Sequence, residues 1–314
     1  MKKNYFPALI LMGFVFGCKV LSKQETAGLQ SLTKAMDTAS ILPSKFVCDY
    51  YGVAFETQQA NYAVQLDNPK KIDDLDKLVA EESEADSIVK GYSSGYGVLK
   101  KYADLLLSLS DTAYLKAFSK QKDAFIPSFD TLIVNYNNYF PKNKLPVATL
   151  GSLIGKVVDE IGSRRIKYLQ RKYLRQVVTE ADTVVNTICR HYNIIDFYKN
   201  NKQLASLNTD IEQSYKAMLK YVALAKISDP FYFYKQCDPI YLTWKNKANV
   251  LTNFNIQTLN SMTNIAIAHT KFKKELYKKT SFKDFTISLQ ALYGSVNALQ
   301  ENYQKFRRNF SSLK

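Results

Sequence analysis

A short glycine- and serine-containing segment has the residue spacing of a hydrolase nucleophile. The segment from Gly91 to Gly95 fits the pattern G-x-S-x-G, which in α/β-hydrolases places a serine on a sharp turn between a strand and a helix. The two histidines of the chain, His191 and His269, follow this segment in the order that such a serine triad needs. A serine esterase that uses Ser93 is therefore one hypothesis for the function.

The surroundings of this motif favour a different interpretation. Residues Ala80 to Lys90 are acidic and helical in pattern, whereas the hydrolase motif needs a buried strand at this place. Both histidines fall on apolar helical stripes, where interior histidines with satisfied hydrogen bonds are more common than catalytic ones. The alternative is a flexible hinge from Gly91 to Gly97, in which Ser93 or Ser94 caps the next helix. We expect no enzymatic activity.

The remaining chemistry-bearing residues form no recognisable metal or cofactor motif. Cys189 and His191 lack the second ligand pair of a zinc site, and the sequence contains no H-E-x-x-H, no P-loop and no G-x-G-x-x-G after a strand. We therefore expect no metal and no cofactor. Apart from Cys18, the cysteines are Cys48, Cys189 and Cys237, which allow at most one internal disulfide. We interpret them mainly as small residues packed between helices.

The N-terminal residues carry a more specific signal. Lys2 and Lys3 precede an apolar stretch from Ala8 to Phe16, which is too short to span a bilayer as a permanent helix. The stretch ends in the run Val15-Phe16-Gly17-Cys18. This run resembles the lipobox of bacterial lipoproteins, although Phe16 stands where that family usually has a small residue.

The resemblance implies where in the cell the protein is located and how its N-terminus is processed. It implies that residues 1–17 are a signal peptide removed before Cys18, and that Cys18 carries diacylglycerol and an acyl chain such as palmitate. Two or more acyl chains anchor a protein stably. Lys19, rather than an aspartate, follows the cysteine, which in this family implies the outer membrane. Since no acidic residue follows up to Gln24, we expect a position facing the periplasm.

The strong positive charge bears on possible partners. The formal net charge is +15, and in a cell envelope the available polyanions are lipid headgroups, phosphates and acidic polymers rather than nucleic acid. Arg164, Arg171 and Arg175 share one face of a predicted helix and could present guanidinium groups to an anion or an acidic partner. The alternative is an ordinary solvated helix face. Acidic residues instead gather between Asp67 and Asp86.

Four consecutive aromatic residues form a second candidate contact site. Phe231, Tyr232, Phe233 and Tyr234 lie between the dipeptides Asp229-Pro230 and Asp238-Pro239, which indicate a loop. Exposed aromatic side chains dominate many binding sites. The alternative interpretation is a plug that closes the end of a helical bundle.

Apolar side chains recur with a helical period over most of the chain. The most regular stripe alternates steps of three and four residues, which places its members on one helix face. Its residues are Phe282, Phe285, Leu289, Leu292, Val296, Leu299, Tyr303, Phe306 and Phe310. Ser281 and Asp284 have the spacing of a capping box and mark the predicted start of this helix.

Similar periodicity predicts further helices over residues 115–139, about 147–195 and 204–225. Pro127 is expected to kink or split the first of these. Predicted breaks at 140–146, 199–203 and 279–281 would let neighbouring helices fold back on one another. The sequence therefore predicts an all-α, elongated antiparallel helical bundle of about six to eight helices with coiled-coil-like hairpins. Residues 18–45 are predicted to be a lipidated, polar tether, and residues 46–314 the bundle domain.

These observations favour a lipid-anchored envelope protein that acts by binding another protein or an envelope polymer. The alternative is a membrane-active protein or a periplasmic component of a secretion or efflux assembly, suggested by the stretch from Leu145 to Ile161. That stretch is apolar at its start, but Lys156 and Asp159 interrupt it well short of the roughly 20 residues that a membrane span needs.

Overall fold

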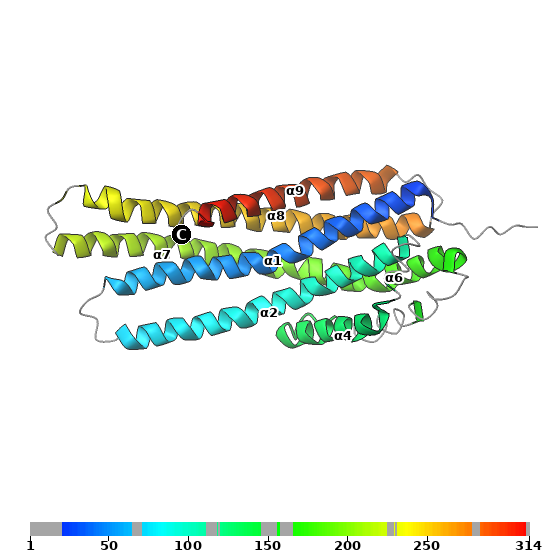
Figure 1. The fold of residues 1–314 in the computed structure, drawn as a ribbon, viewed down its shortest axis with the longest axis horizontal. Helices are drawn as coiled ribbons and strands as arrows, with labels where there is room; N and C mark the ends of the chain where they lie inside the picture. Colours follow the sequence, from blue (N-terminus) through cyan, green and yellow to red (C-terminus); the bar gives the residue numbers. More distant parts are fainter. Residues whose placement is uncertain are drawn as a thin grey trace, which may run out of the picture.

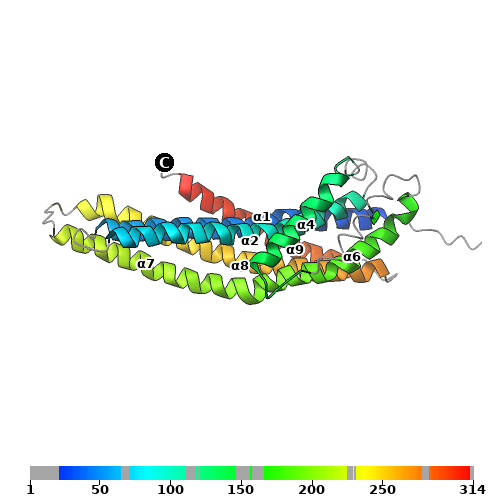
Figure 2. The same cartoon turned by 90° about the horizontal axis from the view of Figure 1, so that it is seen from below.

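Long helices lie side by side along one axis in a computed structural model of the chain (Figures 1 and 2). The structure describes residues 21–64, 71–110, 118, 120–145, 156–157, 166–224, 229, 231–277 and 283–311. Within these ranges there are seven α-helices and no strand. The predicted all-α class and elongated bundle are therefore confirmed.

The helices form antiparallel layers. α1 (Lys23–Ala63) pairs with α2 (Lys71–Ser110), and α4 (Lys122–Tyr139) packs on α2. α6 (Ile166–His191) continues through a π-helical turn, η1 (Tyr192–Asp196), into α7 (Phe197–Leu224), so that the three make one long rod. A second π-helical turn, η2 (Phe233–Cys237), leads into α8 (Asp238–Tyr277), which runs back along the rod, and α9 (Lys283–Ser311) returns along α8.

The predicted apolar stripes form the core of this bundle. In α9, Phe285, Leu289, Leu292, Val296 and Leu299 are buried and Tyr303 is half-buried. In α7, the buried residues are Asn200, Leu204, Leu207, Ile211, Ser214, Met218 and Val222. Ser281 and the side chains of Phe282, Phe306 and Phe310 lie outside the described residues.

The predicted tether is wrong for residues 23–45, because these residues form the first half of α1. The helix begins with a capping box, in which Ser22 Oγ accepts from the Glu25 N–H and the Glu25 carboxylate accepts from the Ser22 N–H. Its buried face keeps steps of three and four residues through both halves. The members of this face are Leu29, Leu32, Met36, Ala39, Pro43, Phe46, Tyr50, Val53 and Thr57.

The predicted hinge at Gly91 to Gly97 is also wrong, because these residues lie in the middle of α2. The glycines allow α4 to come close instead. A β-carbon on Gly91 would lie 2.9 Å from Tyr139 Cβ, and one on Gly97 would lie 3.0 Å from Leu132 Cδ2. The glycine-rich segment is therefore a packing surface for α4.

Two further sequence predictions differ from the structure. The break expected at Lys199 to Gln203 is absent, because α7 is helical from Phe197 onwards and Leu204 continues its buried face. Pro127 lies in the second turn of α4 and does not split it, since the helix continues through this residue; the predicted kink stays a prediction. The break predicted after Tyr139 is present, since residues 140–145 are not helical.

The described helices do not have membrane-spanning character. None of them combines the length and the hydropathy that a transmembrane helix requires. Of the stretch from Leu145 to Ile161, the structure describes only Leu145, Lys156 and Val157. The membrane-active alternative therefore stays a prediction.

Candidate functional site

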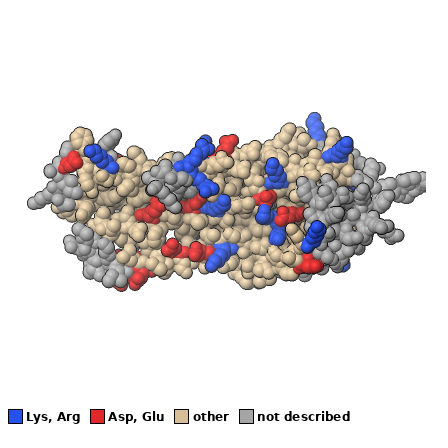
Figure 3. All heavy atoms as spheres, in the orientation of Figure 1, with Lys and Arg blue, Asp and Glu red and all other residues tan. Residues whose placement is uncertain are grey.

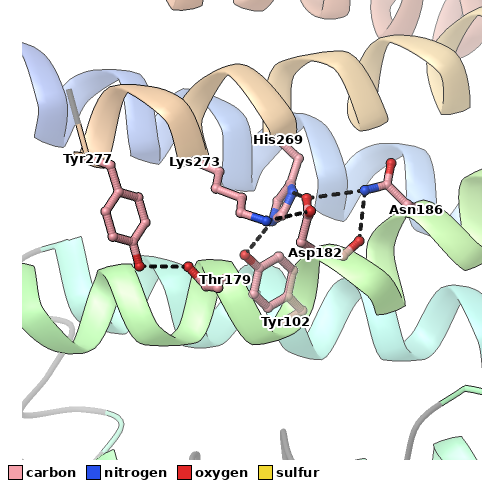
Figure 4. Close-up of polar contacts among 7 residues, drawn as sticks. All are labelled: Tyr102, Thr179, Asp182, Asn186, His269, Lys273 and Tyr277. Carbon is pink, nitrogen blue, oxygen red and sulfur yellow. Dashed lines mark hydrogen bonds and ion pairs between the residues drawn. The ribbon is translucent and has the colours of Figure 1, made fainter.

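A buried polar network joins α2, α6 and α8 around His269 (Figure 4). The Nε2 atom of His269 lies 2.8 Å from the Tyr102 hydroxyl, and Nδ1 lies 3.2 Å from Asp182 Oδ1. Asp182 Oδ2 also accepts a hydrogen bond from Lys273 Nζ at 2.7 Å. Asn186, one turn further along α6, donates to Asp182 Oδ1. The network therefore ties three helices together through one carboxylate and one imidazole.

Charge and burial shift the acidity of two members of this network. Hydrogen bonds from His269 and Lys273 lower the pKa of Asp182 to about 2, although partial burial opposes the shift. Burial, and secondarily the negative charge of Asp182, raises the pKa of Tyr102 well above its ordinary value. Asp182 is thus ionised and Tyr102 protonated at all physiological pH values.

A tyrosine, histidine and aspartate in sequence could move a proton in an enzyme, but this arrangement lacks access for a substrate. His269 is completely buried, and both of its ring nitrogens have partners within the protein. A buried polar group costs free energy unless it is hydrogen-bonded, and here the network meets that requirement. The network accounts for helix–helix cohesion, as expected for an interior histidine.

His191 lies in a second buried network beside the π-helical turn. Its Nε2 is 3.2 Å from Asp196 Oδ1, and its Nδ1 is 3.3 Å from the Tyr136 hydroxyl. The ring of Phe140 packs against the imidazole, with 4.5 Å between ring centroids. His191 and Asp196 are both buried, so this histidine also has interior partners rather than an exposed face.

Ser93 does not occupy a nucleophile elbow. It is an exposed residue in the middle of α2, and residues 71–110 are helical on both sides of it. Ser94 is buried and donates a hydrogen bond to the Lys90 carbonyl oxygen, 2.9 Å away. The strand-to-helix turn that gives the G-x-S-x-G motif its chemistry is therefore missing here.

Arg171 and Arg175 are engaged inside the bundle. The Arg171 guanidinium forms an ion pair with Glu25 at 3.0 Å, joining α6 to the start of α1. Arg175 Nε donates to the Leu276 carbonyl oxygen at 2.6 Å, and its guanidinium lies over the Tyr277 ring. Both guanidinium groups therefore already have partners within the chain, and their predicted anion- or partner-binding role stays a prediction; Arg164 lies outside the described residues.

The aromatic segment divides between surface and core. Phe231 has 61% of its surface exposed, whereas Tyr232 packs against the hydrophobic core. The side chains of Phe233 and Tyr234 lie outside the described residues. Residues 233–237 are helical, so the segment is a loop only in its first part. Phe231 alone among the described side chains fits the predicted contact loop.

The described cysteines are all free thiols. Cys189 and Cys237 are buried and Cys48 is exposed. Burial raises the pKa of the Cys189 thiol to about 12, which keeps it protonated. In the described part of the chain, no three His, Cys, Asp or Glu side chains come close enough to hold a metal ion. Cys18 lies outside the described residues.

The accessible site is a groove between α1 and α2, which we call the α1–α2 groove. Its volume is about 310 Å³, and its lining residues are Cys48, Tyr50, Tyr51, Gly52, Ala54, Phe55, Gln58, Leu78, Glu81, Glu82, Ala85, Asp86 and Val89. Tyr50, Leu78 and Ala85 are buried at its base, while Glu81, Glu82 and Asp86 are exposed at its rim. Volumes of this size are typical of ligand-binding sites.

Small residues on both facing helices create this groove. Leu78, Glu82, Ala85 and Val89 lie on the face of α2 that lines it, and Ala85 is too small to fill the space. On α1, a β-carbon placed on Gly52 would have no atom within 4 Å. Two long helices therefore pair without closing their interface here.

The rim is acidic in a protein of strongly positive charge. Among the described residues, no ion pair involves Glu81, Glu82 or Asp86. Figure 3 shows acidic and basic side chains interspersed along one face of the molecule, so the acidic character is local to the groove rim rather than general. The acidic run from Asp67 to Asp86 is visible in the sequence, whereas the groove is not, because its hollow depends on the pairing of α1 with α2.

Comparison with known proteins gives no further guidance, since no family model, curated protein or solved structure matches this chain.

Proposed function

We propose that this chain is a lipid-anchored helical protein of the bacterial cell envelope that acts by binding a partner, without catalysis. The observation that carries the proposal is the open α1–α2 groove, with buried aromatic and apolar residues at its base and exposed carboxylates at its rim that pair with no described cation. The two histidines, by contrast, lie in closed networks with interior partners. A site built for contact is thus accessible, while the residues best suited to acid–base chemistry are not.

The position of α1 relative to Cys18 supports an anchoring role for the N-terminus. α1 begins at Lys23 with Ser22 as its cap. Only residues 19–22 separate Cys18 from the helix, and four residues span at most about 14 Å. The pair between Glu25 and Arg171 fastens this end of α1 to α6. An acylated Cys18 would therefore hold one end of the rigid bundle directly at the membrane surface.

The same geometry sets the height of the groove. Gly52 lies 29 residues beyond Lys23 along α1, which corresponds to about 44 Å at 1.5 Å per residue. The bundle, rather than a polar tether, would carry the groove away from the bilayer. Since Lys19 follows the cysteine, the proposed location is the outer membrane, facing the periplasm, and the proposed partner is a protein or polymer of that compartment.

Site-specific photo-crosslinking in cells tests this function. A photoreactive amino acid replaces Phe55, which lines the groove, or Ile287, which is exposed on α9 and outside the groove. We expect a discrete adduct from position 55, with little or none from position 287. Adducts only from position 287 would contradict binding through the groove. Turnover of a substrate that is lost in Ser93→Ala, or in a His191→Ala/His269→Ala double variant, would contradict a non-catalytic role.

A further inference from the structure

We infer that the α1–α2 groove binds a basic polypeptide segment, with a large apolar side chain in the hollow beside Gly52 and Lys or Arg side chains at the acidic rim. The inference rests on the proposed function, because it names the chemistry of the partner at the same groove. Three properties of the groove support the inference: its apolar base, its acidic rim and the open space beside Gly52.

The base of the groove fits an apolar side chain. Tyr50, Leu78 and Ala85 are buried there, and Phe55 and Val89 are half-buried beside them. A peptide anchor residue such as Leu, Phe or Trp would remove this apolar surface from water, which is the usual source of affinity in peptide-binding grooves. The open space at Gly52 provides room for the anchor.

The rim fits cationic side chains. Glu81, Glu82 and Asp86 all lie on the groove side of α2, and no Lys or Arg side chain within the described ranges forms an ion pair with them. An uncompensated acidic rim attracts positive charge and rejects negative charge. The overall formal charge of +15 repels a cationic partner. Preference for such a partner must therefore come from the groove itself.

The spacing of the rim carboxylates favours a partner with more than one positive charge. Residues 81 and 86 are five positions apart on one helix, or about 7.5 Å along its axis. A single ammonium group cannot contact both ends of this row, whereas two basic residues flanking an apolar anchor can. The carboxylates are exposed at the rim rather than buried at the base, which suits side chains reaching in from a polypeptide outside.

The absence of a side chain at Gly52 leaves space in the groove that a ligand could occupy. Glycine is the poorest helix former apart from proline, and no neighbouring atom of this protein requires its small size. A larger side chain there would improve the helix and fill the gap between α1 and α2. The groove thus exists at the expense of local helix stability. A larger side chain at position 52 should therefore reduce ligand binding without reducing the stability of the protein.

The test measures fluorescence anisotropy of a 14-residue amphipathic Leu–Lys peptide with the purified full-length protein, against a Leu–Glu peptide of the same length and pattern. We expect the Leu–Lys peptide to bind at least tenfold more tightly. Non-specific attraction to a protein of charge +15 would give the opposite order. Equal binding, or tighter binding of the Leu–Glu peptide, would overturn the inference.

Matched variants assign the binding to the groove. The triple variant Glu81→Gln/Glu82→Gln/Asp86→Asn should weaken Leu–Lys binding at least tenfold. The triple variant Asp73→Asn/Asp76→Asn/Glu84→Gln removes the same charge from exposed positions of α2 that do not line the groove, and should change binding less than twofold. Equal effects of the two triple variants would overturn the inference, because they would show attraction to α2 in general.

Gly52→Leu gives an independent readout. It should abolish Leu–Lys binding while the protein keeps or raises its melting temperature. Undiminished binding of the Leu–Lys peptide to folded Gly52→Leu would overturn the inference. Binding of a small arylalkyl ammonium ion without binding of the peptide would also overturn it, because the groove would then accept one cation and not a polypeptide. Failure of the peptide together with a retained crosslink from position 55 would reject the basic partner but leave the proposed function standing. Loss of that crosslink would instead reject the proposed function.

Discussion

Gly95 of α2 lies against the Cδ2–Cε2 edge of the Tyr136 ring of α4, so that a β-carbon on Gly95 would come within 2.6 Å of Tyr136 Cδ2. The ring has little freedom to move, because its hydroxyl contacts His191 Nδ1 and its face packs against Phe140. The contact explains why a glycine-rich segment occurs inside a long helix. Close approach of α4, rather than flexibility, requires the missing side chain.

Gly95→Ala should therefore destabilise the protein. Overpacking a tight contact typically costs about 1–3 kcal/mol, which outweighs the gain of up to about 1 kcal/mol in helix propensity. Gly52→Ala is the matched control, because a β-carbon there meets nothing within 4 Å, and it should stabilise by about 0.5–1 kcal/mol. Urea unfolding measures both. Changes of the same sign would contradict the close packing of α2 and α4.

The Asp182 network should make stability sensitive to acid. The pKa of Asp182 is lowered to about 2 in the folded protein, so its stabilising contribution is complete above about pH 4 and is lost as the pH falls towards 2. Because the carboxylate is partly exposed, we expect about 1–2 kcal/mol.

The stability difference between the parent protein and Asp182→Asn should therefore shrink between pH 4 and pH 2. Chemical denaturation at several pH values measures this difference. Glu212→Gln, which removes an exposed ion pair with Lys245, serves as the control and should show little effect. A difference that stays constant over the whole range would show that the carboxylate charge has no stabilising role.

Asp49 should behave in the opposite way. Burial raises its pKa to about 7, although Lys45 and Arg307 oppose the shift. The folded protein then binds more protons than the unfolded chain between about pH 4 and pH 7, so stability falls as the pH rises through this range. Asp49→Asn should stabilise the protein at pH 8 by about 1–2 kcal/mol and have almost no effect at pH 4. Thermal unfolding at the two pH values checks this, and a stabilisation of equal size at both would contradict it.

Cys48 reports on the electrostatics of the α1–α2 groove. Burial raises the pKa of its thiol, and the negative charges of Asp49 and Asp86 raise it further. Alkylation of Cys48 by iodoacetamide should therefore need a higher pH than alkylation of a free cysteine, and Asp86→Asn should shift the rate profile to lower pH. Mass spectrometry resolves the modified residue, with buried Cys189 and Cys237 as slow internal references. An unchanged profile in Asp86→Asn would mean that this carboxylate does not act on the groove.

The sequence predicted those helices whose stripes consist of large apolar residues. The stripe of α9 from Phe285 to Leu299 is of this kind, and its burial follows from periodicity alone. The buried face of α1 has the same period, but Ala39, Pro43 and Thr57 occupy three of its positions. Their small or polar side chains made the segment resemble a tether.

The groove and the glycine surface depend on contacts between different helices, which local sequence patterns do not reveal. A glycine-rich segment looks the same whether it bends or receives another helix, and only the position of Tyr136 distinguishes the two. Gly52 and Ala85 each look unremarkable until α1 pairs with α2 and leaves a hollow between them. The acidic run of α2 is visible in the sequence, but the sequence does not show that Glu81, Glu82 and Asp86 form no ion pair with another described residue.

The proposed anchoring of the bundle by acylated Cys18 determines how far the groove lies from the membrane and which compartment holds its partner. The most direct measurement is the mass of the N-terminal peptide of the protein isolated from the membrane fraction. We expect a peptide that begins at Cys18 and carries diacylglycerol and an acyl chain, and loss of this modification in Cys18→Ala. An N-terminal peptide that retains residues before an unmodified Cys18 would contradict it.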